Sequence, residues 1–177
     1  MLEYFNEDIG IGTFPQELRT LNLGRHFDRT LREGSLPPYL QRLEFGNYFN
    51  SPINKDVLPE ELQELILGED FNQPFEAGSL PASLRILTLG KDFNQRFVKG
   101  SLPLNLKALR LPEKYNHPFV KGVLPLNLKA LCLPEEYNHP FEEGSLPDGI
   151  EILTLGQAFN HPFVKGVLPL NLKALCL

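Results

Sequence analysis

Proline recurs every 22 residues along the whole chain, and this fixed period sets the strictest limit on its fold. The recurring residues are Pro15, Pro37, Pro59, Pro81, Pro103, Pro125, Pro147 and Pro169. Sequence periods of about 20 to 50 residues are typical of solenoids, in which each repeat forms one coil and packs against the next. Because a solenoid is long and open, the period predicts an extended surface and argues against an enclosed pocket.

Each repeat carries apolar residues, mostly leucines, three, six and eight positions after its proline, as Leu62, Leu65 and Leu67 do after Pro59. Side chains of a β-strand alternate between its two faces, so this spacing predicts one short strand per repeat with its leucines inward. Successive strands are expected to stack about 4.8 Å apart. The sequence therefore predicts a repeat solenoid of about eight coils, mainly parallel β, with extended or 3₁₀ segments on its back face. The predicted single domain spans 1–177, with a partial coil over 1–13, 22-residue repeats over 14–167 and a partial repeat over 168–177.

Aromatic residues recur at the same two positions of the repeats. The first column holds Phe5, Phe27, Phe49, Phe71, Phe93, Tyr115, Tyr137 and Phe159, and the second holds Phe75, Phe97, Phe119, Phe141 and Phe163. The two remaining phenylalanines, Phe14 and Phe45, stand at leucine positions. All thirteen phenylalanines are thus expected to point inward. One fully buried side chain of this size contributes roughly 1.5 to 3 kcal/mol, so the columns predict a continuous core.

Asparagine and glycine form further columns that have structural explanations. The polar column holds Asn6, Asp28, Asn50, Asn72, Asn94, Asn116, Asn138 and Asn160. At a buried corner, such a stack is expected to bond the backbone groups of neighbouring coils. One glycine column holds Gly12, Gly34, Gly78, Gly100, Gly122, Gly144 and Gly166, with Asp56 as its exception. Since Asp tolerates left-handed dihedrals, positive φ is expected throughout that column.

A second glycine column calls for a different explanation. It holds Gly24, Gly46, Gly68, Gly90 and Gly156, and Pro112 and Pro134 take the same position in two repeats. Proline fixes φ near −65°, so positive φ cannot be the requirement here. Close backbone approach is expected instead.

The segment after each predicted strand resembles the core of a known repeat. Its copies are Phe49-Asn50-Ser51-Pro52, Phe71-Asn72-Gln73-Pro74, Tyr115-Asn116-His117-Pro118, Tyr137-Asn138-His139-Pro140 and Phe159-Asn160-His161-Pro162. These motifs, with the flanking Leu-Pro and the period of 22, resemble the FNIP repeat, a relative of the leucine-rich repeat named for its Phe-Asn-x-Pro core. Essentially the whole chain is similar to that family, which implies a leucine-rich-repeat-like solenoid. Departures from the pattern are Asp28, Thr30 and Arg96.

The resemblance also implies a class of function. The family looks like one found mainly in social amoebae and giant DNA viruses, where the array often follows an F-box and would select a target for a ubiquitin ligase. Here Met1 is followed within five residues by Phe5-Asn6, so no F-box is expected before the array. The resemblance therefore supports the binding half of that function, with a protein partner that the sequence does not identify.

Composition limits the partners further. The net charge of −5 is dispersed and acidic, so nucleic acid is not expected as a partner. Hydrophobic residues make up 42% of the chain, and no apolar run approaches the roughly 20 residues that span a bilayer, so no membrane partner is expected. Met1 to Gly12 has no basic region before an apolar stretch, which predicts a cytoplasmic protein, in the host cytoplasm if the chain is viral.

Few residues suggest chemistry. His117, His139 and His161 share one column in three consecutive repeats and could in principle approach a metal, but no carboxylate or thiol joins them. Copying of His together with its repeat is the favoured explanation. Cys132 and Cys176 lie two coils apart, roughly 9.6 Å, too far for a disulfide. They are expected to be free thiols on the outward side, and the chain is predicted not to be an enzyme and to hold no catalytic, metal or cofactor site.

The outward side of the predicted strands is where residue type is not dictated by packing. The residues predicted to bind a protein partner there are Arg42, Glu44, Glu64, Ile66, Ile86, Thr88, Arg110, Cys132, Ile152 and Thr154. Ile86 and Ile152, with Ile66 and two alanines, suggest a mildly apolar stripe of a few hundred Å². The alternative is that β-branched and small residues merely suit a strand. The predicted function is a non-enzymatic protein-interaction scaffold.

The last repeat suggests a second function from a different class. Leu172, Leu175 and Leu177 stand on a strand with no polar cap after it. An uncapped coil exposes apolar side chains and unpaired backbone groups, which favours end-to-end association. Either the array dimerises or polymerises through its ends as a self-assembling structural protein, or it is part of a longer polypeptide.

Overall fold

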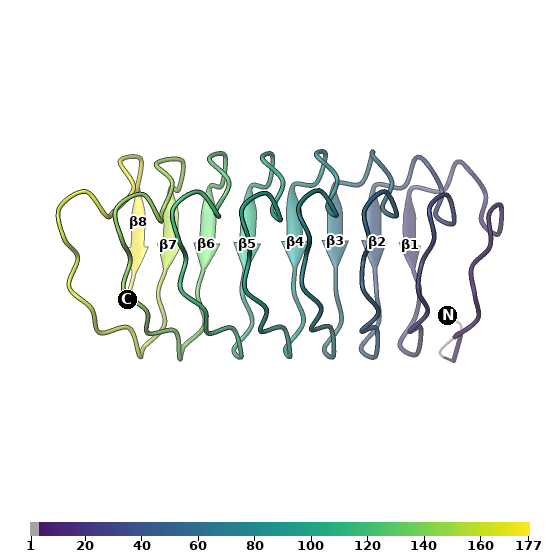
Figure 1. Cartoon of the computed structure of the whole chain (residues 1–177), viewed down its shortest axis with the longest axis horizontal. Coiled ribbons are helices and arrows are strands. Elements are labelled where there is room, and N and C mark those ends of the chain that lie inside the picture. The colour runs from purple at the N-terminus through teal and green to yellow at the C-terminus, as the bar shows by residue number, and fades with distance from the viewer. Residues whose placement is uncertain (1–3) are drawn as a thin grey trace.

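The computed structural model describes residues 4–177 as a stack of coils, each of which contributes one strand to a single parallel sheet (Figure 1). The strands are β1 (Thr20–Asn22), β2 (Arg42–Glu44), β3 (Glu64–Ile66), β4 (Ile86–Thr88), β5 (Ala108–Arg110), β6 (Ala130–Cys132), β7 (Ile152–Thr154) and β8 (Ala174–Cys176). Their order in the sheet is their order in the sequence. The predicted repeat solenoid is therefore confirmed.

Every pair of neighbouring strands has the same register. Leu21 pairs with Leu43 and Leu43 with Leu65, so equivalent residues of successive repeats lie side by side. The central leucine of each strand points inward, and Leu43 and Leu65 are fully buried. The residues on either side of it point outward, as strand alternation requires. One register thus aligns every column of the sequence into a row on the molecule.

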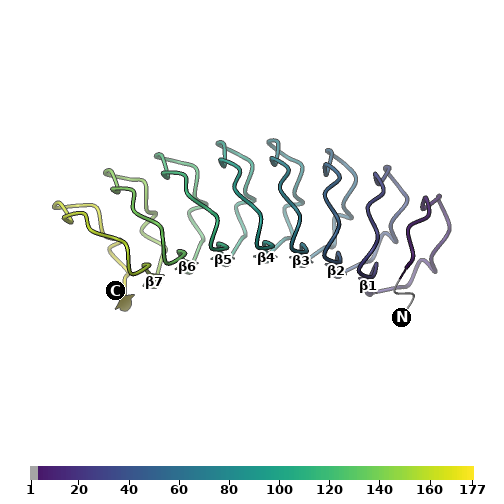
Figure 2. The same ribbon diagram turned by 90° about the horizontal axis from the view of Figure 1, so that it is seen from below.

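The molecule is an arc with the sheet on its concave side (Figure 2). Coils lie closer together at their strands than at the opposite edge, which gives the stack its curvature. The convex side consists of extended segments and single turns. In the turn directly before β2, the Leu40 backbone N–H donates to the Pro37 carbonyl at 3.2 Å. No residue from 4 to 177 lies in a helix.

Stacked aromatic rings form the centre of the core. Phe71 and Phe93 lie 6.2 Å apart between centroids with planes 1° apart, and Phe93 and Tyr115 lie 6.4 Å apart with planes 3° apart. Burial raises the pKa of Tyr115, and it raises the pKa of Tyr137 to about 12. A dry environment disfavours the phenolate, so both phenols stay neutral in the column.

The second phenylalanine column is less buried at the last described coil than in the middle of the array. Phe119 is buried, whereas Phe163 is 36% exposed. The two occupy equivalent positions, but a neighbouring coil covers Phe119 on each side. No coil among the described residues packs beyond Phe163. Burial in this fold is therefore supplied by both neighbours of a coil.

The polar column forms a ladder of hydrogen bonds between coils. The Asn72 backbone N–H donates to Oδ1 of Asn50, and the Asn94 N–H donates to Oδ1 of Asn72, both at 2.9 Å. Asp28 takes the same role by accepting from the Asn50 N–H at 2.9 Å. The expected bonding is confirmed, but the corner is not buried, because these bonds lie at an exposed edge. The ladder thus gives backbone N–H groups a hydrogen-bond acceptor in the preceding coil, beyond the end of each strand.

The two glycine columns differ as predicted. Asp56 has a φ of 63° and Gly34 a φ of 74°, and the other members of that column also have positive φ. In the second column, a Cβ placed on Gly90 would lie 1.6 Å from the Gly68 carbonyl oxygen. Close approach therefore excludes a side chain at Gly90. Gly24 is an exception in the second column, because its φ is 79°.

Candidate interaction face

The concave face comprises the outward side chains of β1 to β8 and the residues directly before each strand. Parallel register places the ten predicted binding residues on it in two rows. The first row includes Arg42, Glu64, Ile86 and Ile152, and the second includes Glu44, Ile66, Thr88, Arg110, Cys132 and Thr154. Ile86 is 44% exposed and Ile152 is 47% exposed. Half-buried Ala108 and Ala130 lie between them in the same row.

Charges at the start of the face are paired within it. The Arg42 guanidinium lies 2.5 Å from a Glu64 carboxylate oxygen and 3.1 Å from one of Glu44. The hydrogen bonds that Arg42 donates to Glu64, and then to Glu44, raise the pKa of Arg42. Two carboxylates and one guanidinium leave this part of the face with one excess negative charge. It offers little to an anionic partner.

A second network of ion pairs lies at the far end of the concave face. The Glu151 carboxylate lies 2.8 Å from the Lys129 ammonium and 2.7 Å from the Lys173 ammonium. The neighbouring cations, Lys129 first and then Lys173, lower the pKa of Glu151 to about 2. One carboxylate shared by two lysines leaves an excess positive charge.

Between these networks, Arg85, Lys107 and Arg110 are exposed. Among residues 4–177, no ion pair within 4 Å includes any of the three. Arg85 and Lys107 stand directly before β4 and β5, and the Lys107 backbone N–H donates to the Arg85 carbonyl at 2.8 Å. Both line an open hollow of about 440 Å³, together with Glu61 and Gln63 of the preceding coil.

Sequence reasoning missed Arg85 and Lys107 as residues of this face. It counted only the alternate positions inside each strand, and these two precede the strands by one residue. A usable signal was present, since a cation recurs directly before several strands. Its members are Arg19, Arg85, Lys107, Lys129 and Lys173.

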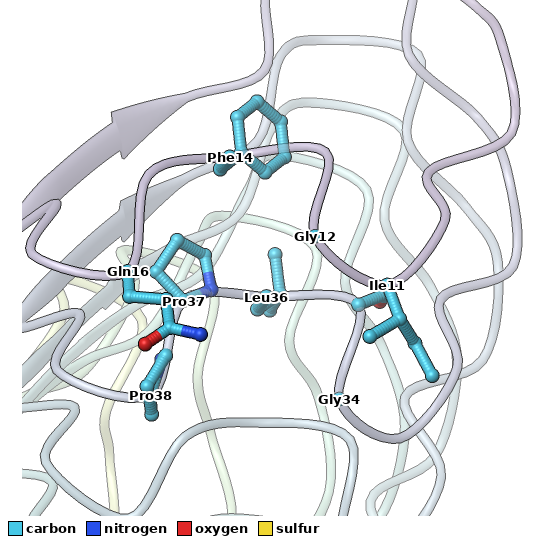
Figure 3. A pocket seen from close by; sticks show the side chains of 9 residues that line it. Ile11, Gly12, Phe14, Gln16, Gly34, Leu36, Pro37 and Pro38 are labelled. Carbon is cyan, nitrogen blue, oxygen red and sulfur yellow. The ribbon is translucent and has the colours of Figure 1, made fainter.

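A smaller hollow lies near the first strand (Figure 3). It measures about 100 Å³, and Ile11, Phe14 and Leu36 lie around it with Pro37 and Pro38. None of its nine lining residues carries an ionisable side chain. Acid–base chemistry needs at least one such group within reach of a substrate. The hollow therefore holds no group for such chemistry. Its lining residues come from two successive coils, and the hollow is a gap between them.

The histidine column connects successive coils. Nε2 of His117 lies 3.1 Å from the Asn94 carbonyl oxygen, and Nε2 of His139 lies 3.1 Å from that of Asn116. His161 makes the same contact with Asn138 at 3.0 Å. Nε2 of each of the three rings thus contacts a backbone carbonyl of the preceding coil. Within residues 4–177, no three His, Cys, Asp or Glu side chains are grouped closely enough to hold a metal ion.

Cys132 and Cys176 are free thiols, as predicted. Cys132 is half-buried in β6 and Cys176 is exposed in β8, with β7 between the two strands. Both side chains lie on the outward side of their strands, next to buried or central leucines. The spacing of the coils keeps the sulfurs apart.

The last described coil has an exposed apolar side. Leu177 is 82% exposed, Leu175 is 36% exposed, and Leu172 is partly buried. Strand β8 has a partner only on its β7 side among the described strands.

Across residues 4–177, we find no helix with the length and apolar character needed to cross a bilayer.

A family model described as FNIP Repeat matches residues 5–48, 27–70, 71–114 and 137–177. The chain belongs to the FNIP-repeat family. Repeat solenoids of the FNIP and leucine-rich kinds are generally non-enzymatic scaffolds, and the concave face fits an interaction role of that kind.

A solved structure shows the same architecture. It is described as CroV588, a novel circular LRR protein, and it superposes on the FNIP array with a TM-score of 0.81 at 33% sequence identity. The match covers 98% of this chain and 29% of CroV588, so the array spans less than a third of that protein. A search of curated proteins found no match.

Proposed function

We propose that this FNIP array binds a protein partner on its concave face. The observation that carries the proposal is the row of Ile86, Ala108, Ala130 and Ile152, in which two exposed isoleucines flank two small residues on a curved sheet. Exposed apolar surface of this kind, surrounded by polar residues, is typical of interaction sites.

Variation between repeats supports the proposal. Inward positions carry nearly the same residue in every coil because the core requires it. The outward row changes from Thr20 through Arg42 and Glu64 to Ile86, although these residues have the same backbone position. Nothing in the packing of the coils demands this change. Residue type on the concave face is therefore free to specify a partner.

Replacing both isoleucines tests the proposal. Ile86→Asp with Ile152→Asp places two carboxylates in the apolar row, and we expect capture of partners from an extract of the native cells to fall at least about tenfold. The matched control is Val98→Asp with Val164→Asp, which changes two exposed valines outside the sheet. Quantitative mass spectrometry of cross-linked partners compares the two. Equal loss in both variants, or no loss in the first, contradicts the proposal.

The family resemblance supports a finer version of this proposal. In that version, the bound protein is a target for a ubiquitin ligase, and the array selects it as in F-box proteins with FNIP repeats. The cross-linked partners distinguish the two versions, because a ligase adaptor should then be captured with the target.

A second candidate function is end-to-end association of this chain with itself. Two observations favour it: the exposed Leu175 and Leu177 on the last described coil, and the circular form of CroV588. Copies joined end to end would continue the arc. Light scattering over a hundredfold concentration range should then show growth in mass that Leu175→Asp abolishes. A constant mass near 20.1 kDa contradicts this candidate.

A further inference from the structure

We propose that the partner site on β4 to β6 takes an acidic protein segment with apolar side chains at its centre. This inference rests on the proposed function, because it names the chemical class of partner for the same concave face.

The charges of the middle coils are the first argument. Arg85, Lys107 and Arg110 have no ion-pair partner within residues 4–177, whereas the Arg42 guanidinium lies between two carboxylates. The chain as a whole carries a net charge of −5. A local excess of cations on an acidic protein attracts anionic groups selectively to that place. The middle of the concave face is thus the part suited to carboxylates.

The arrangement of these cations is the second argument. Arg85 and Lys107 stand one residue before the apolar row of Ile86 and Ala108, and Arg110 stands two residues after Ala108. The row therefore has cations along both margins. A bound segment that places leucine-like side chains on the row brings its acidic side chains to these margins. Arginine suits this role because its guanidinium can bond a carboxylate with two parallel donors.

The open hollow beside the sheet supplies room on one margin. Its lining includes Arg85, Lys107 and Asn105, which together offer charged and neutral donors. Its volume of about 440 Å³ exceeds that of a single carboxylate-bearing side chain. Glu61 of the preceding coil also lines the hollow, and its carboxylate disfavours a second anion beside it. A partner carboxylate would therefore lie between Arg85 and Lys107.

A protein segment fits this surface better than a nucleic acid does. Nucleic acid is held mainly by many cations on phosphates, and the Arg42 network with Glu44 and Glu64, which carries one excess negative charge, lies directly beside the middle coils. An apolar row at the centre of the site also has no use in binding phosphates. Apolar and acidic side chains together are a property of proteins.

Short fluorescein-labelled peptides test the inference by fluorescence anisotropy on the full chain. The first probe alternates Glu and Leu, the second Glu and Ser, the third Lys and Leu, and the fourth is a single-stranded oligonucleotide. We expect the Glu/Leu peptide to bind most tightly and to weaken as salt screens the charges. Reversing the cations in Arg85→Glu, Lys107→Glu and Arg110→Glu should lower its affinity at least about tenfold.

The matched control reverses three exposed lysines on the turns outside the sheet, in Lys99→Glu, Lys121→Glu and Lys165→Glu. It changes the net charge equally, so retained binding in this control supports a local site. Equal loss in both variants overturns the inference, as does tighter binding of the Lys/Leu peptide or of the oligonucleotide. Circular dichroism confirms that each variant is folded.

The two proposals fail in different ways. If no acidic peptide binds but cross-linked partners are still lost on Ile86→Asp with Ile152→Asp, the concave face binds proteins and only the acidic class is wrong. If no acidic peptide binds and the capture of cross-linked partners does not fall on Ile86→Asp with Ile152→Asp, the proposed function fails together with the inference.

Discussion

Phe93→Ala is expected to destabilise the array by about 3 to 5 kcal/mol, the range typical of deleting a buried phenylalanine. The Phe93 ring is fully buried and stacks on Phe71 and Tyr115 in the coils on either side. It also lies 5.5 Å from the Phe97 ring between centroids. Its removal opens a cavity in the middle of the core. Urea unfolding followed by far-ultraviolet circular dichroism measures the loss.

Phe163→Ala is the matched control, because it deletes the same kind of ring from the last described coil. Among the described residues, a neighbouring coil packs against that coil on one side only. Phe163 is partly exposed, so its removal creates little enclosed cavity. We expect its cost to be less than half that of Phe93→Ala. Similar costs for the two variants would mean that ring stacking between coils does not determine stability.

Gly90→Ala is expected to cost about 3 kcal/mol through steric overlap, the upper part of the usual range for overpacking. The added Cβ would lie 1.6 Å from the Gly68 carbonyl oxygen and 3.0 Å from the Glu69 Cα. Both atoms belong to the backbone of the preceding coil and cannot rotate away. The coils must therefore separate locally, and the Asp92 N–H bond to the Glu69 carbonyl, 2.8 Å long, weakens with them.

Gly122→Ala separates this overlap from the general cost of replacing glycine. Gly122 has a φ of +81° and no atom within 4 Å of its ideal Cβ, so its replacement incurs only the left-handed penalty of roughly 1 to 2 kcal/mol. Thermal melting of both variants gives the comparison. A larger loss for Gly122→Ala would show that the preceding coil moves freely to admit a side chain at Gly90.

The fold could be predicted because its evidence is repeated along the chain. A single leucine such as Leu65 does not predict the direction of its side chain, but eight equivalent apolar residues at one spacing define an inward row. Asp56 strengthened the prediction by replacing glycine at the one position where its φ of 63° is tolerated. Register followed from the same period, since a slip in any coil would displace its leucines from the core.

The remaining features depend on relations between coils that the repeat does not encode. Segments 116–133 and 160–177 are identical in sequence, yet Phe119 is buried and Phe163 is exposed. Curvature depends on the difference in spacing between the two edges of a coil. Arg85 and Lys107 were not predicted as residues of the concave face, because they precede the strands. Outside a strand, simple alternation no longer gives the direction of a side chain. The class of partner could not be predicted from the repeat either, because the outward residues that would contact it are not constrained by the core.

The uniform register has a consequence for how the gene can change. Recombination between two copies of a repeat inserts or removes whole coils in frame, and every surviving coil still meets a neighbour with the same pairing, as Leu43 meets Leu65. The eighteen identical residues at 116–133 and 160–177, two repeats apart, are what a recent duplication leaves. Each added coil lengthens the concave face by one row. In such a lineage, new specificities arise from the number and order of coils as well as from point substitutions.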